Sequence, residues 1–159
     1  MLLFLPYQTS IRPWRTPYAN YALIAVNILI FIVSYYPVSD PINGRQMILR
    51  DWAHSFMLTP ARPYIWQFVT YAFLHGNIGH VLGNMFFLWL FGCNVNDKLG
   101  HIGYISFYLA GAVFSGIGHT LLGGGNVLGA SGAVAAVTGA YLALFPQTLI
   151  RVFYWIYFF

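Results

Sequence analysis

Four stretches of this sequence are long and apolar enough to cross a lipid bilayer. A membrane-spanning helix needs roughly 20 mostly apolar residues, and the candidates cover approximately residues 19–36, 78–95, 102–122 and 127–145. A fifth apolar stretch extends over 11 residues, from Leu149 to Phe159. We therefore expect an all-α polytopic membrane protein with four complete spans and the start of a fifth, in a chain cut before its natural end.

The composition supports lipid as the surrounding medium. Of the 159 residues, 59% are hydrophobic and only 6% are charged, whereas a soluble domain carries about 25% charged residues. A disordered chain would be poor in apolar residues and rich in charge. The seven Lys and Arg residues are scattered singly among three acidic residues, so no basic stripe is present to bind nucleic acid. The single cysteine, Cys93, excludes an intrachain disulfide.

The chain divides into an N-terminal segment, residues 1–18, and a membrane domain, residues 19–159. A loop of roughly 40 residues joins the first two spans, and its aromatic composition favours short amphipathic helices in the interfacial layer. The other connections are short, at residues 94–101, 123–126 and 146–148. The residues Arg12, Arg15, Lys98 and Arg151 would share one side of the membrane. The density of positive charge predicts that this side, with the N-terminus, is cytoplasmic.

Two polar side chains in the second span lie four residues apart. His80 and Asn84 would share one face of a helix, one turn apart. Polar groups inside hydrocarbon are costly and indicate function, and two neutral donors on a rigid helix suit the stabilisation of an oxyanion. Hydrogen bonding between helices is an alternative role for the pair. A metal site is disfavoured because no carboxylate or thiolate is near them in sequence.

Ser131 stands at the predicted start of the fourth span. It lies between Gly129 and Gly132, where a helix N-terminus favours developing negative charge and the glycines let another backbone approach. The alternative is that Ser131 is one more small residue in a tight helix crossing, because Gly132, Ala136 and Ala140 form a row of small residues. His119, near the end of the third span, is expected to be interfacial or hydrogen-bonded rather than catalytic.

Four motifs occur in a recognisable order: WQFVT at 66–70, LHGN at 74–77, HVLGN at 80–84 and GASG at 129–132. With them, the chain resembles the rhomboid family of intramembrane serine proteases over approximately residues 20–145. The resemblance implies a six-helix core and cleavage of transmembrane-anchored protein substrates, with the bilayer as the other partner and no metal or cofactor. It implies that Ser131 is the nucleophile and that His80 and Asn84 line the oxyanion hole with the backbone N–H of Ser131. It also implies that four further residues support the structure of the site: Trp66, His75, Gly129 and Gly132.

The sequence departs from the family pattern at three points. Gln67 replaces an arginine of the first loop, and Asn96 stands where a glutamate is common. The family's general base is a histidine on the sixth core helix, but all five histidines of this chain precede Ser131. We therefore expect the base beyond Phe159. The alternative function is a non-catalytic rhomboid-like protein that binds transmembrane clients. A channel or transporter is disfavoured because the spans lack charged residues and an inverted repeat.

Overall fold

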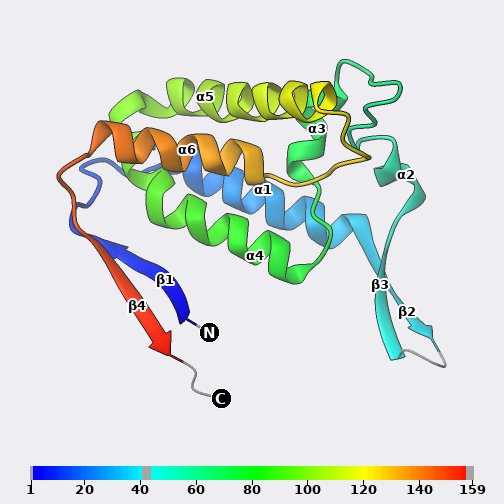
Figure 1. The fold of residues 1–159 in the computed structure, drawn as a ribbon, viewed down its shortest axis with the longest axis horizontal. Coiled ribbons are helices and arrows are strands. Elements are labelled where there is room, and N and C mark those ends of the chain that lie inside the picture. The colour runs from blue at the N-terminus through cyan, green and yellow to red at the C-terminus, as the bar shows by residue number, and fades with distance from the viewer. Residues whose placement is uncertain (1, 41–43, 157–159) are drawn as a thin grey trace.

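The computed structural model describes residues 2–40 and 44–156, and most of this part is helical (Figure 1). The main helices are α1 (Tyr18–Ser34), α4 (Ile78–Phe87), α5 (Cys93–Leu121) and α6 (Ser131–Leu144). A π-helix, η2 (Leu88–Gly92), joins α4 to α5 without a loop. The long connection between α1 and α4 contains three short helical segments, α2 (Asp51–His54), α3 (Gln67–Thr70) and η1 (Tyr71–Phe73). The strands are β1 (Leu2–Thr9), β2 (Tyr35–Asp40), β3 (Gly44–Leu49) and β4 (Ile150–Ile156).

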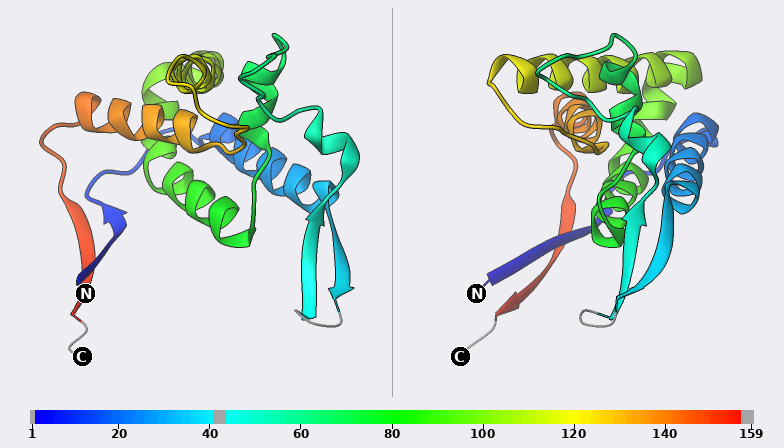
Figure 2. Two further views of the ribbon diagram at one scale, coloured as in Figure 1. Left: turned by 45° about the vertical axis from the view of Figure 1, so that its right-hand side comes forward. Right: turned by 90° about the vertical axis from the view of Figure 1, so that its right-hand side faces the viewer.

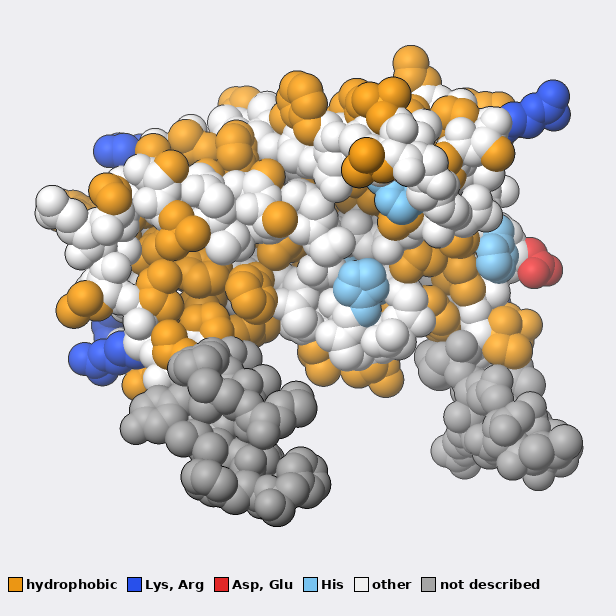
Figure 3. Space-filling view, viewed as in Figure 1, with side chains coloured by type: hydrophobic (Ala, Val, Ile, Leu, Met, Phe, Trp, Pro, Cys, Tyr) orange, Lys and Arg blue, Asp and Glu red, His pale blue; other side chains and the backbone are white. Residues whose placement is uncertain are grey.

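The main helices cover the four predicted spans, but their lengths differ. The helical stretch Ile78–Leu121 is long and apolar enough to cross a membrane by length and composition, although its backbone leaves helical geometry at Gly100. The apolar helices α1 and α6 have 17 and 14 residues, which corresponds to about 26 and 21 Å at 1.5 Å per residue. The number of four spans therefore stays a prediction. The face shown in Figure 3 is largely hydrophobic, with the Lys and Arg side chains near the two ends of its long axis.

The predicted connection at 94–101 does contain the turn between two helical segments, but residues 94–99 are helical and do not form a loop. The chain stays helical from Cys93 and turns at Gly100, whose φ of 71° and ψ of 170° are not helical. A glycine adopts this conformation at little cost because it has no Cβ. Residues 94–96 are buried, and the Asn96 side-chain oxygen accepts a hydrogen bond from the backbone N–H of Asn20 at 3.2 Å. The contact of Asn96 with α1 therefore offsets the cost of burying its polar side chain.

The expectation of an all-α chain with the start of a fifth span is also wrong. Residues 150–156 form β4, which pairs antiparallel with β1, and β2 pairs antiparallel with β3 inside the long loop. The two strand pairs extend from opposite ends of the helices (Figure 2). Ile, Val and aromatic residues, which dominate β4, favour strands, and β1 supplies the partner that satisfies their backbone groups. Apolar composition alone did not distinguish this strand from a helix.

Segments far apart in sequence meet at each end of the helices. At one end, the carboxylate of Asp97 accepts hydrogen bonds from the backbone N–H groups of Trp14 and Arg15 at 2.8 and 3.2 Å. The N–H of Ser10 donates to the carbonyl of Leu149 at 2.9 Å. The N-terminal segment, the α4–α5 corner and the segment after α6 therefore share one end, as expected. Which side of a membrane this end faces stays a prediction.

The crossing of α5 and α6 is close because glycines lie in it. A Cβ at Gly111 would stand 2.7 Å from the Cβ of Ala136, and one at Gly132 would overlap the side chain of Ser115. Ala133 is fully buried in the same crossing. The row Gly132, Ala136 thus faces α5, which brings the first turn of α6 against the middle of α5.

Candidate active site

The start of α4 positions His80 and Asn84 one helical turn apart. The side-chain oxygen of Asn77 caps this helix by accepting a hydrogen bond from the backbone N–H of His80 at 2.8 Å. Such a cap satisfies one of the free donors at a helix start. The His80 side chain is half-buried, and Asn84 is 8% exposed. The capped first turn therefore fixes where α4 begins, and with it the positions of His80 and Asn84.

The imidazole of His80 lies against the backbone of Gly129, two residues before Ser131. A Cβ at Gly129 would stand 2.5 Å from Cε1 and 2.8 Å from Nε2 of His80. Gly129 also has a φ of 132°, which L side chains rarely adopt. Glycine is needed here both for the close approach and for the backbone conformation. The structure thus brings α4 and the segment before α6 together.

Asn84 carries an unused hydrogen-bond donor. Its Nδ2 is buried and has no hydrogen-bond partner within residues 2–40 and 44–156. Buried polar groups are nearly always paired, so an unpaired one requires an explanation. A donor held ready for an oxygen atom that develops negative charge is such an explanation.

Ser131 is the first residue of α6, and its side chain is exposed. The residues that pack against α5 are its neighbours Gly132 and Ala136. The crossing therefore does not require a small residue at position 131. The N–H groups of the first helical turn lack intrahelical acceptors and carry the positive end of the helix dipole. This environment stabilises negative charge that forms beside Ser131.

Tyr71 holds the segment before α6 in place, a role that the sequence did not indicate. Its backbone carbonyl accepts a hydrogen bond from the N–H of Gly129 at 2.9 Å, and its hydroxyl donates to the carbonyl of Ala112 at 2.8 Å. The side chain is 3% exposed. Tyr71 thus links the long loop, α5 and the Gly129 turn. The aromatic density of residues 64–73 was the one available signal, and it suits packing or interface contacts equally well.

Two further contacts hold the α5–α6 loop. Leu58 and Val127 exchange backbone hydrogen bonds at 3.0 Å, which ties this loop to the long loop. His119 Nε2 lies 2.7 Å from the carbonyl oxygen of Gly125. The expectation that His119 is hydrogen-bonded is confirmed. Residues 122–130 are therefore supported on both sides before the chain enters α6.

His75 lies behind His80 in the segment that precedes α4. Its side chain is fully buried, its ring meets the His80 ring edge-on with 5.2 Å between centroids, and its carbonyl accepts a hydrogen bond from the Tyr35 hydroxyl at 2.6 Å. Burial, reinforced by the neighbouring His80, lowers the pKa of His75 to about 4. His75 is therefore neutral at neutral pH and supports the position of His80.

Trp66 and Gln67 lie in the long loop, where they differ in burial. Trp66 is 49% exposed and stacks on Tyr64 with 4.5 Å between ring centroids. Gln67 is 3% exposed; its Oε1 accepts from the N–H of Tyr64 at 3.1 Å and its Nε2 donates to the carbonyl of Ser55 at 3.2 Å. A neutral amide therefore closes the loop where the family has an arginine.

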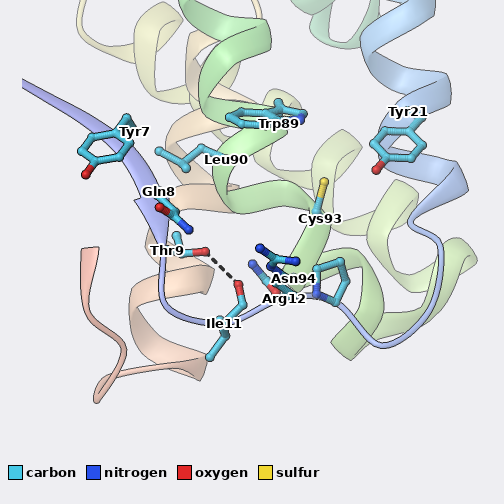
Figure 4. A pocket seen from close by; sticks show the side chains of 11 residues that line it. Tyr7, Gln8, Thr9, Ile11, Arg12, Tyr21, Trp89, Leu90, Cys93 and Asn94 are labelled. Carbon is cyan, nitrogen blue, oxygen red and sulfur yellow. Dashed lines mark hydrogen bonds between the residues drawn. The ribbon is translucent and has the colours of Figure 1, made fainter. Parts of the chain in front are cut away.

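A separate pocket of about 380 Å³ lies at the other end of the helices. Figure 4 shows its lining, which comes from β1 and the segment after it, α1, η2 and the start of α5. It contains none of the predicted site residues. Within the described residues, no three His, Cys, Asp or Glu side chains are grouped so that they could hold a metal ion.

The sequence is similar to known rhomboid proteins. The profile of the Rhomboid domain matches residues 62–159. The chain is 39% identical over 75 residues to the rhomboid protease GlpG of Yersinia pestis (strain Pestoides F), and the alignment covers 47% of this chain and 27% of that protein. It is 36% identical over 75 residues to the rhomboid protease GlpG of Yersinia enterocolitica (strain NCTC 13174 / 8081), with the same coverage. The match thus spans about a quarter of the length of these relatives.

Proposed function

Because this chain belongs to the rhomboid family, whose relatives here include intramembrane proteases, we propose that it is part of a serine endopeptidase that cleaves transmembrane-anchored proteins. Ser131 is the nucleophile, and His80 and Asn84 stabilise the oxyanion. The observation that carries this proposal is the approach of the His80 ring to the Gly129 backbone, beside a buried Asn84 donor without a partner in the described residues. His80 faces the segment that leads into Ser131, and Asn84 lies one helical turn further along α4.

The reaction follows from these positions. The Ser131 oxygen attacks the carbonyl carbon of the scissile peptide bond while its proton passes to a general base. The carbonyl oxygen takes up the negative charge and receives hydrogen bonds from His80, from Asn84 Nδ2 and from the backbone N–H of Ser131. Collapse of this intermediate expels the amine, which takes the proton, and water then hydrolyses the acyl-enzyme. Residues 132–159 contain no histidine, so the base we propose is on a helix that follows Phe159.

The proposed membrane arrangement has four complete spans in this part of the protein, formed by α1, α4 with η2, α5 beyond Gly100, and α6. The end that carries Arg12, Arg15 and Lys98 is cytoplasmic. Ser131 then lies toward the opposite side, below the membrane surface, where water reaches it from the non-cytoplasmic face.

The test is the variant Ser131→Ala in the complete protein that contains this chain, reconstituted with a membrane-anchored substrate. We expect cleavage to be lost and folding to be retained, because Ser131 is exposed and its hydroxyl makes no packing contact required by the α5–α6 crossing. Ser106→Ala, an exposed serine in α5, is the matched control and should cleave normally. Cleavage that survives Ser131→Ala would refute the assignment.

A second function is favoured by Gln67, a neutral and buried side chain where the resemblance implies an arginine. In this alternative, the protein binds transmembrane clients without cleaving them. Ser131→Ala then changes nothing, and client helices co-purify equally with both forms. The same experiment therefore distinguishes the two functions.

A further inference from the structure

A small apolar hollow lies between α1 and the long loop. We call it the loop pocket; it has a volume of about 220 Å³ and is lined by Ile30, Trp52, Phe56, Thr70, Phe73 and Leu74. Thr70 is the one lining residue with a hydroxyl group, and this hydroxyl already donates to the carbonyl of Phe56 at 2.9 Å. The surface that faces the pocket is apolar, so it offers a ligand apolar contact.

The medium beside the loop pocket is lipid. Rhomboid family proteins are integral to membranes, and the outward residues Leu29 and Ile32 of α1 are 60% and 63% exposed. Trp52 and Phe56, which contact each other edge-on, are 45% and 40% exposed. Tryptophan side chains such as Trp52 gather at the level of the lipid headgroups. The pocket thus lies where the apolar surface of α1 meets the membrane interface.

A positive charge is fixed at the same end of α1. Arg50 lies two residues before Trp52, and its backbone N–H donates to the carbonyl of Ser34 at 2.8 Å. Its guanidinium carbon is 5.4 Å from the centroid of the Tyr36 ring, a cation–π distance. The carboxylate of Asp51, the next residue, would repel an anion. An anion is therefore attracted only where the Arg50 guanidinium is held, over the Tyr36 ring. A cation at this level attracts anionic phospholipids.

We propose that the loop pocket holds one acyl chain of a bound anionic phospholipid and that Arg50 contacts its phosphate. Pockets for drug-sized ligands have volumes of roughly 300–1,000 Å³. The loop pocket is smaller, and its size suits part of a single hydrocarbon chain. A peptide segment would place backbone N–H and C=O groups against walls that cannot pair them. The inference requires only that the protein lies in a membrane, so it holds whether or not Ser131 is catalytic.

The test is lipid retention by the purified protein, measured by native mass spectrometry after exchange into vesicles of phosphatidylglycerol or phosphatidylcholine with identical chains. We expect a retained phospholipid, with phosphatidylglycerol preferred. Ile30→Trp fills the loop pocket and should abolish retention. Leu29→Trp adds the same ring to the exposed side of the same helix and should leave retention unchanged.

The role of Arg50 is tested separately. Arg50→Gln should remove the preference for phosphatidylglycerol, whereas Arg62→Gln, at an exposed arginine of the same loop, should preserve it. Equal retention by Ile30→Trp and the unmodified protein would overturn the proposal. So would an Ile30→Trp variant that alters substrate cleavage with lipid retention unchanged, because the pocket would then serve a peptide. Failure of Ser131→Ala to affect cleavage bears only on the proposed function.

Discussion

At the scale of single residues, the polar side chains of α4 were recognisable from sequence because hydrocarbon makes each of them costly. The spacing of His80 and Asn84 indicated a shared face. It could not indicate that His80 would meet the Gly129 backbone or that Asn84 Nδ2 would be left without a partner among the described residues. Both facts depend on how α4 is placed beside the segment before α6. The contribution of Tyr71 was missed for the same reason, since its contacts are with residues 41 and 58 positions away.

Asn84→Ala should separate catalysis from stability. Loss of one oxyanion donor lowers kcat by about 10²-fold or more, while the unfolding free energy should change little because Nδ2 makes no hydrogen bond with a described residue. Steady-state cleavage and unfolding in detergent measure the two effects. Asn27→Ala is the matched control: Asn27 is buried and donates to the carbonyl of Leu23 at 2.8 Å. The Asn27→Ala variant should have a lower unfolding free energy. Full activity of Asn84→Ala would contradict the proposed oxyanion hole.

At the scale of elements, hydrophobic runs located the helices but not all of their ends. The predicted end of the fourth span, at residue 145, agrees with an α6 that ends at Leu144. The start of α6 was expected near Val127, whereas the helix begins at Ser131, because Val127 and Gly129 instead make backbone hydrogen bonds with the long loop. Residues 150–156 form a strand because β1 is available to pair with them. The pairing partners, the long loop and β1, are far away in the sequence, so the local composition could not indicate them.

His119 should influence the site through the α5–α6 loop. His119→Leu removes the contact with the Gly125 carbonyl and should increase hydrogen exchange in residues 122–130 and lower kcat, with KM changed less. His119→Gln keeps a donor of similar reach and should restore both. Thr120→Val, which loses a bond within α5 to the carbonyl of Gly116, serves as the control for helix stability. Equal kinetics for Leu and Gln at position 119 would show that the contact has no positioning role.

At the scale of the whole molecule, buried groups connect the site to stability. His75 is fully buried, its carbonyl accepts a hydrogen bond from the hydroxyl of Tyr35 in β2, and its ring lies against His80. Because its folded pKa of about 4 is below the unfolded value of about 6.5, the unfolded state binds the proton more readily. The stability that His75 contributes is therefore complete above about pH 6.5 and is lost as the pH falls toward 4.

Acid should reveal this coupling. Between pH 7 and pH 5, the unmodified protein should lose about 2 kcal/mol of unfolding free energy through His75. His75→Phe should show a correspondingly smaller loss, measured by reversible unfolding in detergent. His54→Gln, an exposed histidine of α2, should follow the unmodified protein. If His75→Phe loses as much stability with acid as the unmodified protein, another group is responsible for the loss.

The membrane class, the approximate positions of the main helices, the family resemblance and the candidate residues Ser131, His80 and Asn84 could be determined from sequence alone. These features depend on apolar run length, helical periodicity and short motifs, all of which are local. The tertiary structure decided which residues meet: the His80–Gly129 contact, the buried Gln67, the exposed Trp66 and the β1–β4 pair. The reason is physical. Burial and hydrogen-bond partners are properties of pairs of segments, and the order of residues along the chain does not specify which segments lie together.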